Sequence, residues 1–172
     1  MKKTLLLLAV VLMGMSMMAQ STYTMIASES ELNAGDKVIL VGFDNDGNAF
    51  VMSYQKSNNR HAVAIDVTGG TITTTVATSA SSQTDPFELT VGGASGAWTF
   101  FDALNNGYLY APGGGNYLKT QSTLDDKGQW DLEIEEDGFK PVSNGGVEQN
   151  IMRYNVTSTL FGCYKSPESR FS

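Results

Sequence analysis

Cysteine and histidine are nearly absent from this chain of 172 residues, in which Cys163 and His61 are the only members of their types. A single cysteine forms no internal disulfide, and one cysteine with one histidine leaves a zinc site short of its usual ligands. A cysteine–histidine catalytic pair also needs a third group to orient the base. We interpret Cys163, which lies in an apolar run, as a small buried residue, and His61 as a surface residue after a polar turn. The sequence therefore predicts a protein that is not an enzyme and holds no metal or cofactor.

The chain also lacks an apolar run of the ~20 residues that a membrane-spanning helix needs. Its N-terminal apolar run, Leu5–Met13, follows Lys2 and Lys3 and gives way to small and flexible residues that end at Ala19-Gln20, with no cysteine nearby for lipid attachment. A charged start, a short apolar middle and a small residue at the exit are typical of a bacterial secretory signal peptide. We predict that residues 1–19, called the leader below, are removed and that the protein is exported to the periplasm or the extracellular space.

Basic residues are in the minority, with 11 Lys and Arg against 18 Asp and Glu, for a formal net charge of −7. Removal of the two leader lysines changes this charge to −9. Such an excess of carboxylates repels phosphate backbones and argues against nucleic acid as a partner. The 153 residues from Gln20 to Ser172 are enough for one domain that buries roughly 70% of its unfolded surface.

Apolar and polar residues alternate in short runs that are separated by Gly, Asn, Asp and Ser. The run beginning at Phe87 continues with Leu89 and Val91, and the run beginning at Trp130 continues with Leu132 and Ile134. A period of two places the apolar members of each run on one face of a strand. Each run ends at a glycine turn and is followed by another aromatic residue, Trp98 or Phe139. This pattern predicts an all-β domain built from hairpins.

Several matched positions are separated by the same 43 residues, and this spacing predicts an internal repeat. The pairs are Phe87 and Trp130, Gly107 and Asn150, Leu109 and Met152, and Leu118 and Phe161. We divide the domain 20–172 into unit 1 (23–85, with a Thr/Ser-rich insertion at Thr68–Thr84), unit 2 (86–129) and an incomplete unit 3 (130–172). Three units of four strands predict a β-trefoil-like barrel, with another small antiparallel barrel or sandwich as the alternative.

The last strand of unit 3 has no counterpart before Ser172, and its absence leaves the predicted barrel open beside its first strand, Lys37–Phe43. We expect either that the chain is a fragment of a longer secreted protein, which we favour, or that Tyr23–Ile26 covers the opening. An open barrel edge is also a route to oligomers.

Five segments resemble a small all-β module that recurs in secreted proteins of Gram-negative gut bacteria and is largely uncharacterised. They are 32–40, 106–110, 116–120, 129–130 and 161–164. The resemblance covers nearly all of the chain after the leader and implies the all-β fold, but it carries no activity. Members of the module commonly end in a further strand with a Leu-Tyr-Lys-like sequence, which is not found in Lys165–Ser172.

Two acidic patterns resemble a calcium loop and a glycosidase site, but each lacks residues that such a site requires. Asp44–Asn48 begins like a calcium loop, but its sixth and twelfth positions are Ala49 and Gln55 rather than glycine and glutamate, so we predict a hairpin turn. Asp131 and Glu133 alternate with buried positions and form a solvated stripe rather than the facing carboxylates of a glycosidase.

The strongest candidate for binding is a group of tyrosines and amides. Tyr108 and Tyr110 share one face of a predicted strand, and Asn116 and Tyr117 follow the glycine-rich turn after it. Tyrosine rings can cover the C–H faces of a sugar while amides bond its hydroxyls. We predict that these four residues bind a ligand.

The sequence thus favours a secreted, non-catalytic module that binds a glycan or another surface polymer, or a cell-surface protein. The alternatives are a trefoil-type protease inhibitor that presents Thr68–Thr84, and a structural spacer of a longer secreted protein.

Overall fold

The computed structural model describes residues 6–10, 20–135 and 138–165, and within them the chain is all-β, as predicted. Its two helices are single 3-10 turns, η1 (Glu29–Glu31) and η2 (Asp126–Gly128). The strands are β1 (Leu6–Val10), β2 (Ser21–Met25), β3 (Lys37–Phe43), β4 (Ala49–Lys56), β5 (Asn59–Ile65), β6 (Thr71–Thr74), β7 (Leu89–Gly92), β8 (Thr99–Asp102), β9 (Gly107–Tyr110), β10 (Lys119–Gln121), β11 (Trp130–Glu135), β12 (Gly138–Ser143), β13 (Ile151–Asn155) and β14 (Leu160–Tyr164).

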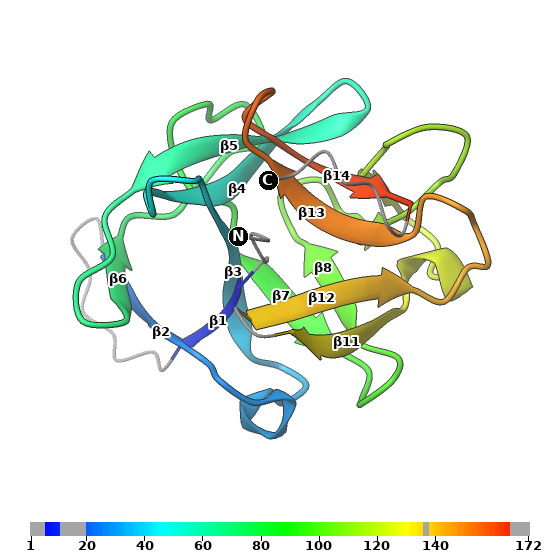
Figure 1. Cartoon of the computed structure of the whole chain (residues 1–172), viewed down its shortest axis with the longest axis horizontal. Coiled ribbons are helices and arrows are strands. Elements are labelled where there is room, and N and C mark those ends of the chain that lie inside the picture. Colours follow the sequence, from blue (N-terminus) through cyan, green and yellow to red (C-terminus); the bar gives the residue numbers. More distant parts are fainter. Residues whose placement is uncertain (1–5, 11–19, 136–137, 166–172) are drawn as a thin grey trace.

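Eleven strands form one curled antiparallel sheet in the order β10-β9-β8-β7-β3-β4-β5-β14-β13-β12-β11 (Figure 1). The sheet bends back on itself where Trp98, just before β8, meets Trp130 at the start of β11. The backbone N–H of each tryptophan donates to the carbonyl of the other, with both N···O distances 2.8 Å. Residues far apart in sequence therefore enclose a common interior.

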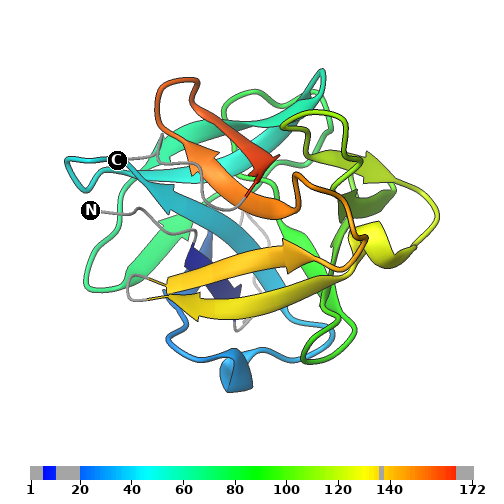
Figure 2. The same cartoon turned by 45° about the vertical axis from the view of Figure 1, so that its right-hand side comes forward.

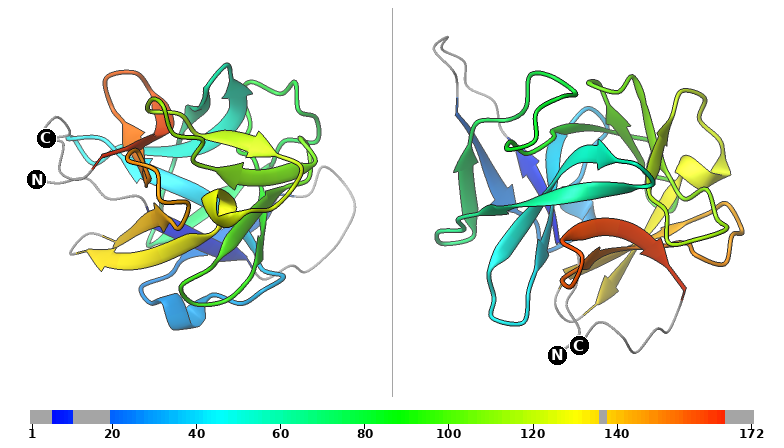
Figure 3. Two further views of the ribbon diagram at one scale, coloured as in Figure 1. Left: turned by 90° about the vertical axis from the view of Figure 1, so that its right-hand side faces the viewer. Right: turned by 90° about the horizontal axis from the view of Figure 1, so that it is seen from above.

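Three strands lie outside this path. β1 pairs with β3 on one side and with β2 on the other, and β6 pairs with the far edge of β2. In two views, β2 and β6 lie on the opposite side of the molecule from β10 and η2 (Figures 1 and 3). The strand beside β3 is thus β1, from the predicted leader, whereas the run Tyr23–Ile26, expected as an alternative cover for β3, belongs largely to the next strand out.

The interior consists of two apolar clusters that share β3. Val38 and Leu40 belong to the larger cluster, and Ile39 and Val41 to the smaller one, which also contains Tyr23 of β2. β3 is buried on both faces, which explains its unbroken apolar sequence.

The predicted alternation holds in β7 and fails at the end of β11. Leu89 and Val91 are buried, as are Trp130 and Leu132, but the side chain of Ile134 is 66% exposed. Ile134 is therefore exposed at the end of this face, although Phe139, the residue opposite it on β12, is buried in the larger cluster; Figure 2 shows the β11–β12 hairpin.

Two predicted loops have defined structures. Asp44–Asn48 forms the turn between β3 and β4, with the Asp44 carboxylate accepting bonds from the N–H groups of Asp46 and Asn48, both 2.9 Å. This confirms the hairpin turn. The insertion Thr68–Thr84 is only partly a loop, because it contains β6, which pairs with β2.

Candidate functional site

Cys163 and His61, the candidate nucleophile and base, are poorly placed for chemistry. Cys163 is a free thiol with no exposed surface, and burial raises its pKa above the usual range. His61 is half-buried and stacks on the ring of Tyr54, with centroids 5.0 Å apart. Its pKa is lowered by burial and then by the charge of Lys56. The thiol is therefore protonated near neutral pH, and the expectation that His61 is simply a surface residue is only partly met.

The acidic stripe on β11 is balanced by basic residues instead of facing another acidic cluster. Glu133 forms an ion pair with Lys140 of β12, and Glu135 lies 3.6 Å from Lys140 and 3.4 Å from Arg153. Across residues 6–10, 20–135 and 138–165 there is no group of three or more His, Cys, Asp or Glu side chains arranged to hold a metal ion. In the same part of the chain, no helix is long and apolar enough to cross a membrane.

The four predicted binding residues lie along β9 and the loop that follows it. Tyr108 and Tyr110 are half-buried on one face of β9, and Leu109 between them is buried on the other. Asn116 is exposed, and its backbone carbonyl accepts a 2.5 Å bond from the Asn59 side chain. The half-buried ring of Tyr117 packs so closely on Gly115 that a Cβ there would lie 2.7 Å from its Cζ atom.

An open groove of about 630 Å³ lies across β7, β8 and β9, and Tyr108 is the only one of the four residues that lines it. Ten other residues line it as well: Thr90, Val91, Gly92, Gly93, Ala94, Ala97, Thr99, Phe101, Leu124 and Gln129. The predicted cluster is therefore divided by the fold. Tyr108 faces the groove, whereas Tyr110, Asn116 and Tyr117 lie outside its lining.

The groove combines apolar rings with hydroxyl and amide groups. The rings of Tyr108 and Phe101 meet edge to face, with centroids 5.1 Å apart and planes at 65°. Leu124 adds an exposed apolar side chain, and Gln129 a half-buried amide. At the edge, the Lys37 ammonium group donates to the Thr90 hydroxyl at 2.6 Å. Such a surface can contact an apolar face and several hydroxyl groups of one ligand.

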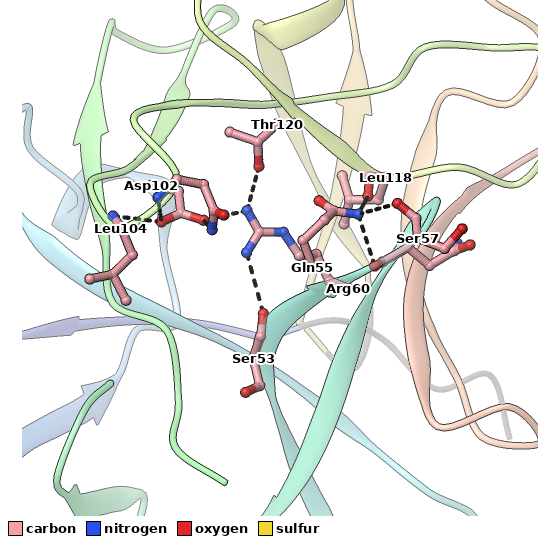
Figure 4. Close-up of polar contacts among 10 residues, drawn as sticks. Ser53, Gln55, Ser57, Arg60, Asp102, Leu104, Leu118 and Thr120 are labelled. Carbon is pink, nitrogen blue, oxygen red and sulfur yellow. Dashed lines mark hydrogen bonds and ion pairs between the residues drawn. The ribbon is translucent and has the colours of Figure 1, made fainter. Parts of the chain in front are cut away.

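A buried polar cluster supports the strand that carries Tyr108 (Figure 4). Arg60 of β5 is bonded to Asp102 at the end of β8 and to the Thr120 hydroxyl of β10, and donates to the Ser53 carbonyl at 3.3 Å. The Asp102 carboxylate also accepts bonds from the N–H groups of Leu104 and Asn105 at 3.0 and 3.1 Å. Because this turn leads directly into β9, Asp102 sets where β9 begins.

Two nearby amide side chains differ in what they contact. The Asn105 side chain donates to Asp102 at 2.7 Å, so its amide holds the turn. Gln129, in contrast, lines the groove. Trp130, the next residue, is completely buried and donates its indole N–H to the Leu109 carbonyl at 3.2 Å.

Comparison of the chain with protein-family models, with curated proteins and with solved structures finds no match. Sequence reasoning missed Phe101, Leu124 and the two threonines of the groove. Phe101 had a local signal, since it follows Phe100 in a short aromatic run, but its pairing with Tyr108 depends on the register of β8 and β9.

Proposed function

We propose that this protein is an exported, non-catalytic binding module whose ligand is a glycan, bound in the groove across β7, β8 and β9. The observation that carries the proposal is the edge-to-face pair of Tyr108 and Phe101 in the same groove as the half-buried Thr90 and Gln129. The rings offer apolar contact to the C–H face of a sugar, and the hydroxyl and amide groups suit its hydroxyls. The net charge of −9 after removal of the leader lysines favours a neutral or weakly charged glycan.

The proposed architecture is β-trefoil-like. Supporting this idea, the strands at β3, β7, β8, β11 and β12 are consecutive neighbours through pairing or through the Trp98–Trp130 bridge. The three hairpins β4–β5, β9–β10 and β13–β14 follow β3, β8 and β12, respectively, in the sequence. The predicted 43-residue spacing also relates buried positions, since Leu109, Met152, Leu118 and Phe161 are all in the larger cluster.

Export and binding are tested on the same sample. The full chain, with its leader, is expressed in a Gram-negative bacterium and purified from the periplasm and medium. Its intact mass is expected to correspond to Gln20–Ser172. After circular dichroism has shown a β spectrum, the protein is applied to a glycan array. Saturable binding to a family of related glycans supports the proposal, whereas a folded sample that binds none of them contradicts it.

A further inference from the structure

β1 occupies a strand position between two other strands. It runs antiparallel to both, with Leu8 opposite Met25 of β2 and opposite Ile39 of β3. Its five residues fill the space that we call the strand slot, bounded by β2 and by residues 38–41 of β3 (Figure 1). A strand in this slot has pairing partners along both edges.

The slot edge of β3 has no other strand to pair with among the described residues. Val38 pairs with both Leu89 of β7 and Ala9 of β1, so these two partners lie on opposite edges of β3. Val41 likewise pairs with Val51 of β4 and with Leu6 of β1. β4 and β7 thus share one edge, and β1 alone covers the other. β12 also comes within 8 Å of β1, measured between Cα atoms.

Along its β3 edge, the slot favours apolar residues on both faces of its occupant. Along β3, Val38 and Leu40 face one apolar cluster while Ile39 and Val41 face the other, and all four are buried. A strand with two buried faces has a continuous apolar sequence instead of an alternating one. The sequence of β1, Leu-Leu-Leu-Ala-Val, meets that requirement.

The residues that fill the slot belong to the predicted leader, so the exported protein loses them when cleavage follows Ala19. β2 then remains attached by its pairing with β6 and by the Tyr23 hydroxyl, which donates to Glu88 at 2.7 Å. β2 itself is a poor replacement, because its sequence Ser-Thr-Tyr-Thr-Met alternates between polar and apolar residues. Cleavage would therefore leave two unpaired edges beside apolar surface, an arrangement that favours strand addition.

We propose that the strand slot of the exported protein accepts an apolar β-strand from a different polypeptide. A second copy of the chain is a poor donor, because strands with successive buried residues such as β4 and β14 are paired along both edges within the sheet. The partner supplies at least five successive apolar residues in an extended conformation, antiparallel to β2 and β3. This site is separate from the glycan groove, which lies across β7–β9.

The probe is a synthetic peptide with the β1 sequence flanked by lysines and labelled with a fluorophore. We expect saturable binding to purified Gln20–Ser172 and a higher melting temperature. A matched peptide with proline in place of the central leucine should bind at least tenfold more weakly, since proline removes an N–H donor and is excluded from the middle of a sheet.

The position of the peptide is tested by cross-linking. Thr24 is exposed and lies opposite Ala9 in the register, and paired residues in antiparallel strands have Cα atoms ~4.5–5.5 Å apart, within disulfide range. The Thr24→Cys protein should form a disulfide with a peptide that carries cysteine at the Ala9 position. The control is Thr73→Cys, because Thr73 is exposed on β6 and pairs with Thr22 instead of β1.

The outcomes separate clearly. Peptide binding with selective cross-linking at Thr24→Cys supports the proposal, as does an unfolded exported chain that folds when the peptide is added. A folded monomer that does not bind the peptide overturns it, and so does an unfolded chain that the peptide fails to rescue. A self-associated dimer with an occupied slot would assign the slot to a second copy, and a retained leader would assign it to β1; either result overturns the proposal.

Discussion

The guanidinium group of Arg60 is bonded to the carboxylate of Asp102, and neither side chain has any exposed surface. The two residues are 42 positions apart, on β5 and at the end of β8. Arg60 also lies over the ring of Phe87, with its Cζ atom 5.7 Å from the ring centroid. Its Nε atom is buried without a hydrogen-bond partner. The pair therefore joins distant strands at the cost of incomplete hydrogen bonding.

Asp102→Asn is expected to lower the free energy of unfolding by about 3–5 kcal/mol, because it leaves the buried Arg60 charge uncompensated. The asparagine oxygen can still accept bonds from the turn, but its NH2 group replaces the oxygen that accepts from Arg60 and from the Asn105 amide, so the change removes these bonds together with the charge. Urea denaturation measures the effect. The matched control is Arg60→Met combined with Asp102→Leu, which removes both charges and should cost less than Asp102→Asn. Equal stability of Asp102→Asn and the wild type would show that the charge pair is not buried as described.

Gly42→Ala is expected to destabilise the fold by about 1–3 kcal/mol through overpacking. A Cβ atom at this position would lie 2.3 Å from the Cβ atom of Tyr154. Because the clash reaches the Cβ atom itself, Tyr154→Ala should not rescue Gly42→Ala, and the double variant should be less stable than Tyr154→Ala alone. Thermal unfolding of the three variants decides this, and a rescued double variant would contradict the close approach of β3 and β13.

Tyr108→Ala is expected to weaken glycan binding at least tenfold, the equivalent of ~1.4 kcal/mol. Tyr110→Ala is the matched control, because Tyr110 is half-buried on the same face of β9 but does not line the groove. Isothermal titration with a glycan selected on the array gives both affinities. A larger loss for Tyr110→Ala or Tyr117→Ala would move the site from the groove to the loop after β9.

The stability of the wild type is expected to fall more than that of His61→Gln when the pH is lowered from 8 to 5.5. Burial and the charge of Lys56 lower the pKa of His61 in the folded protein. Above the ordinary histidine pKa of about 6.5, both states are neutral at this position and the group has no effect. Below it, the unfolded state takes up the proton first, which favours unfolding. Urea midpoints at the two pH values test the sign, and equal pH dependence of both proteins would contradict it.

Cys163 is expected to be unreactive toward a thiol reagent in the folded protein and fully reactive in concentrated denaturant. The side chain is completely buried, and burial raises the pKa of its thiol, so the reactive thiolate is scarce and shielded. Ellman's reagent at pH 8 measures this directly. Rapid labelling of the folded protein would show that β14 opens easily or that its interior face is accessible.

Some of these features were predictable from the sequence because they depend on neighbouring residues. The alternation at Phe87–Val91 identified a strand with one buried face, and Asp44–Asn48 identified a turn. The burial of Cys163 was predictable from the apolar run around it. At Ile134 alternation was not enough, since it shows which side chains share a face but not which of them are covered: Ile134 is exposed and Phe139 opposite it is buried.

By itself, the sequence determined the all-β class, the absence of an internal disulfide and the polar turns, because alternation, cysteine number and turn residues act locally or by count. Only the tertiary structure decided that Tyr108 meets Phe101 in a groove away from Tyr110, that Arg60 bonds Asp102, and that β1 lies between β2 and β3. These relationships depend on strand register and on the curling of the sheet, which bring together residues with no local signal of their proximity.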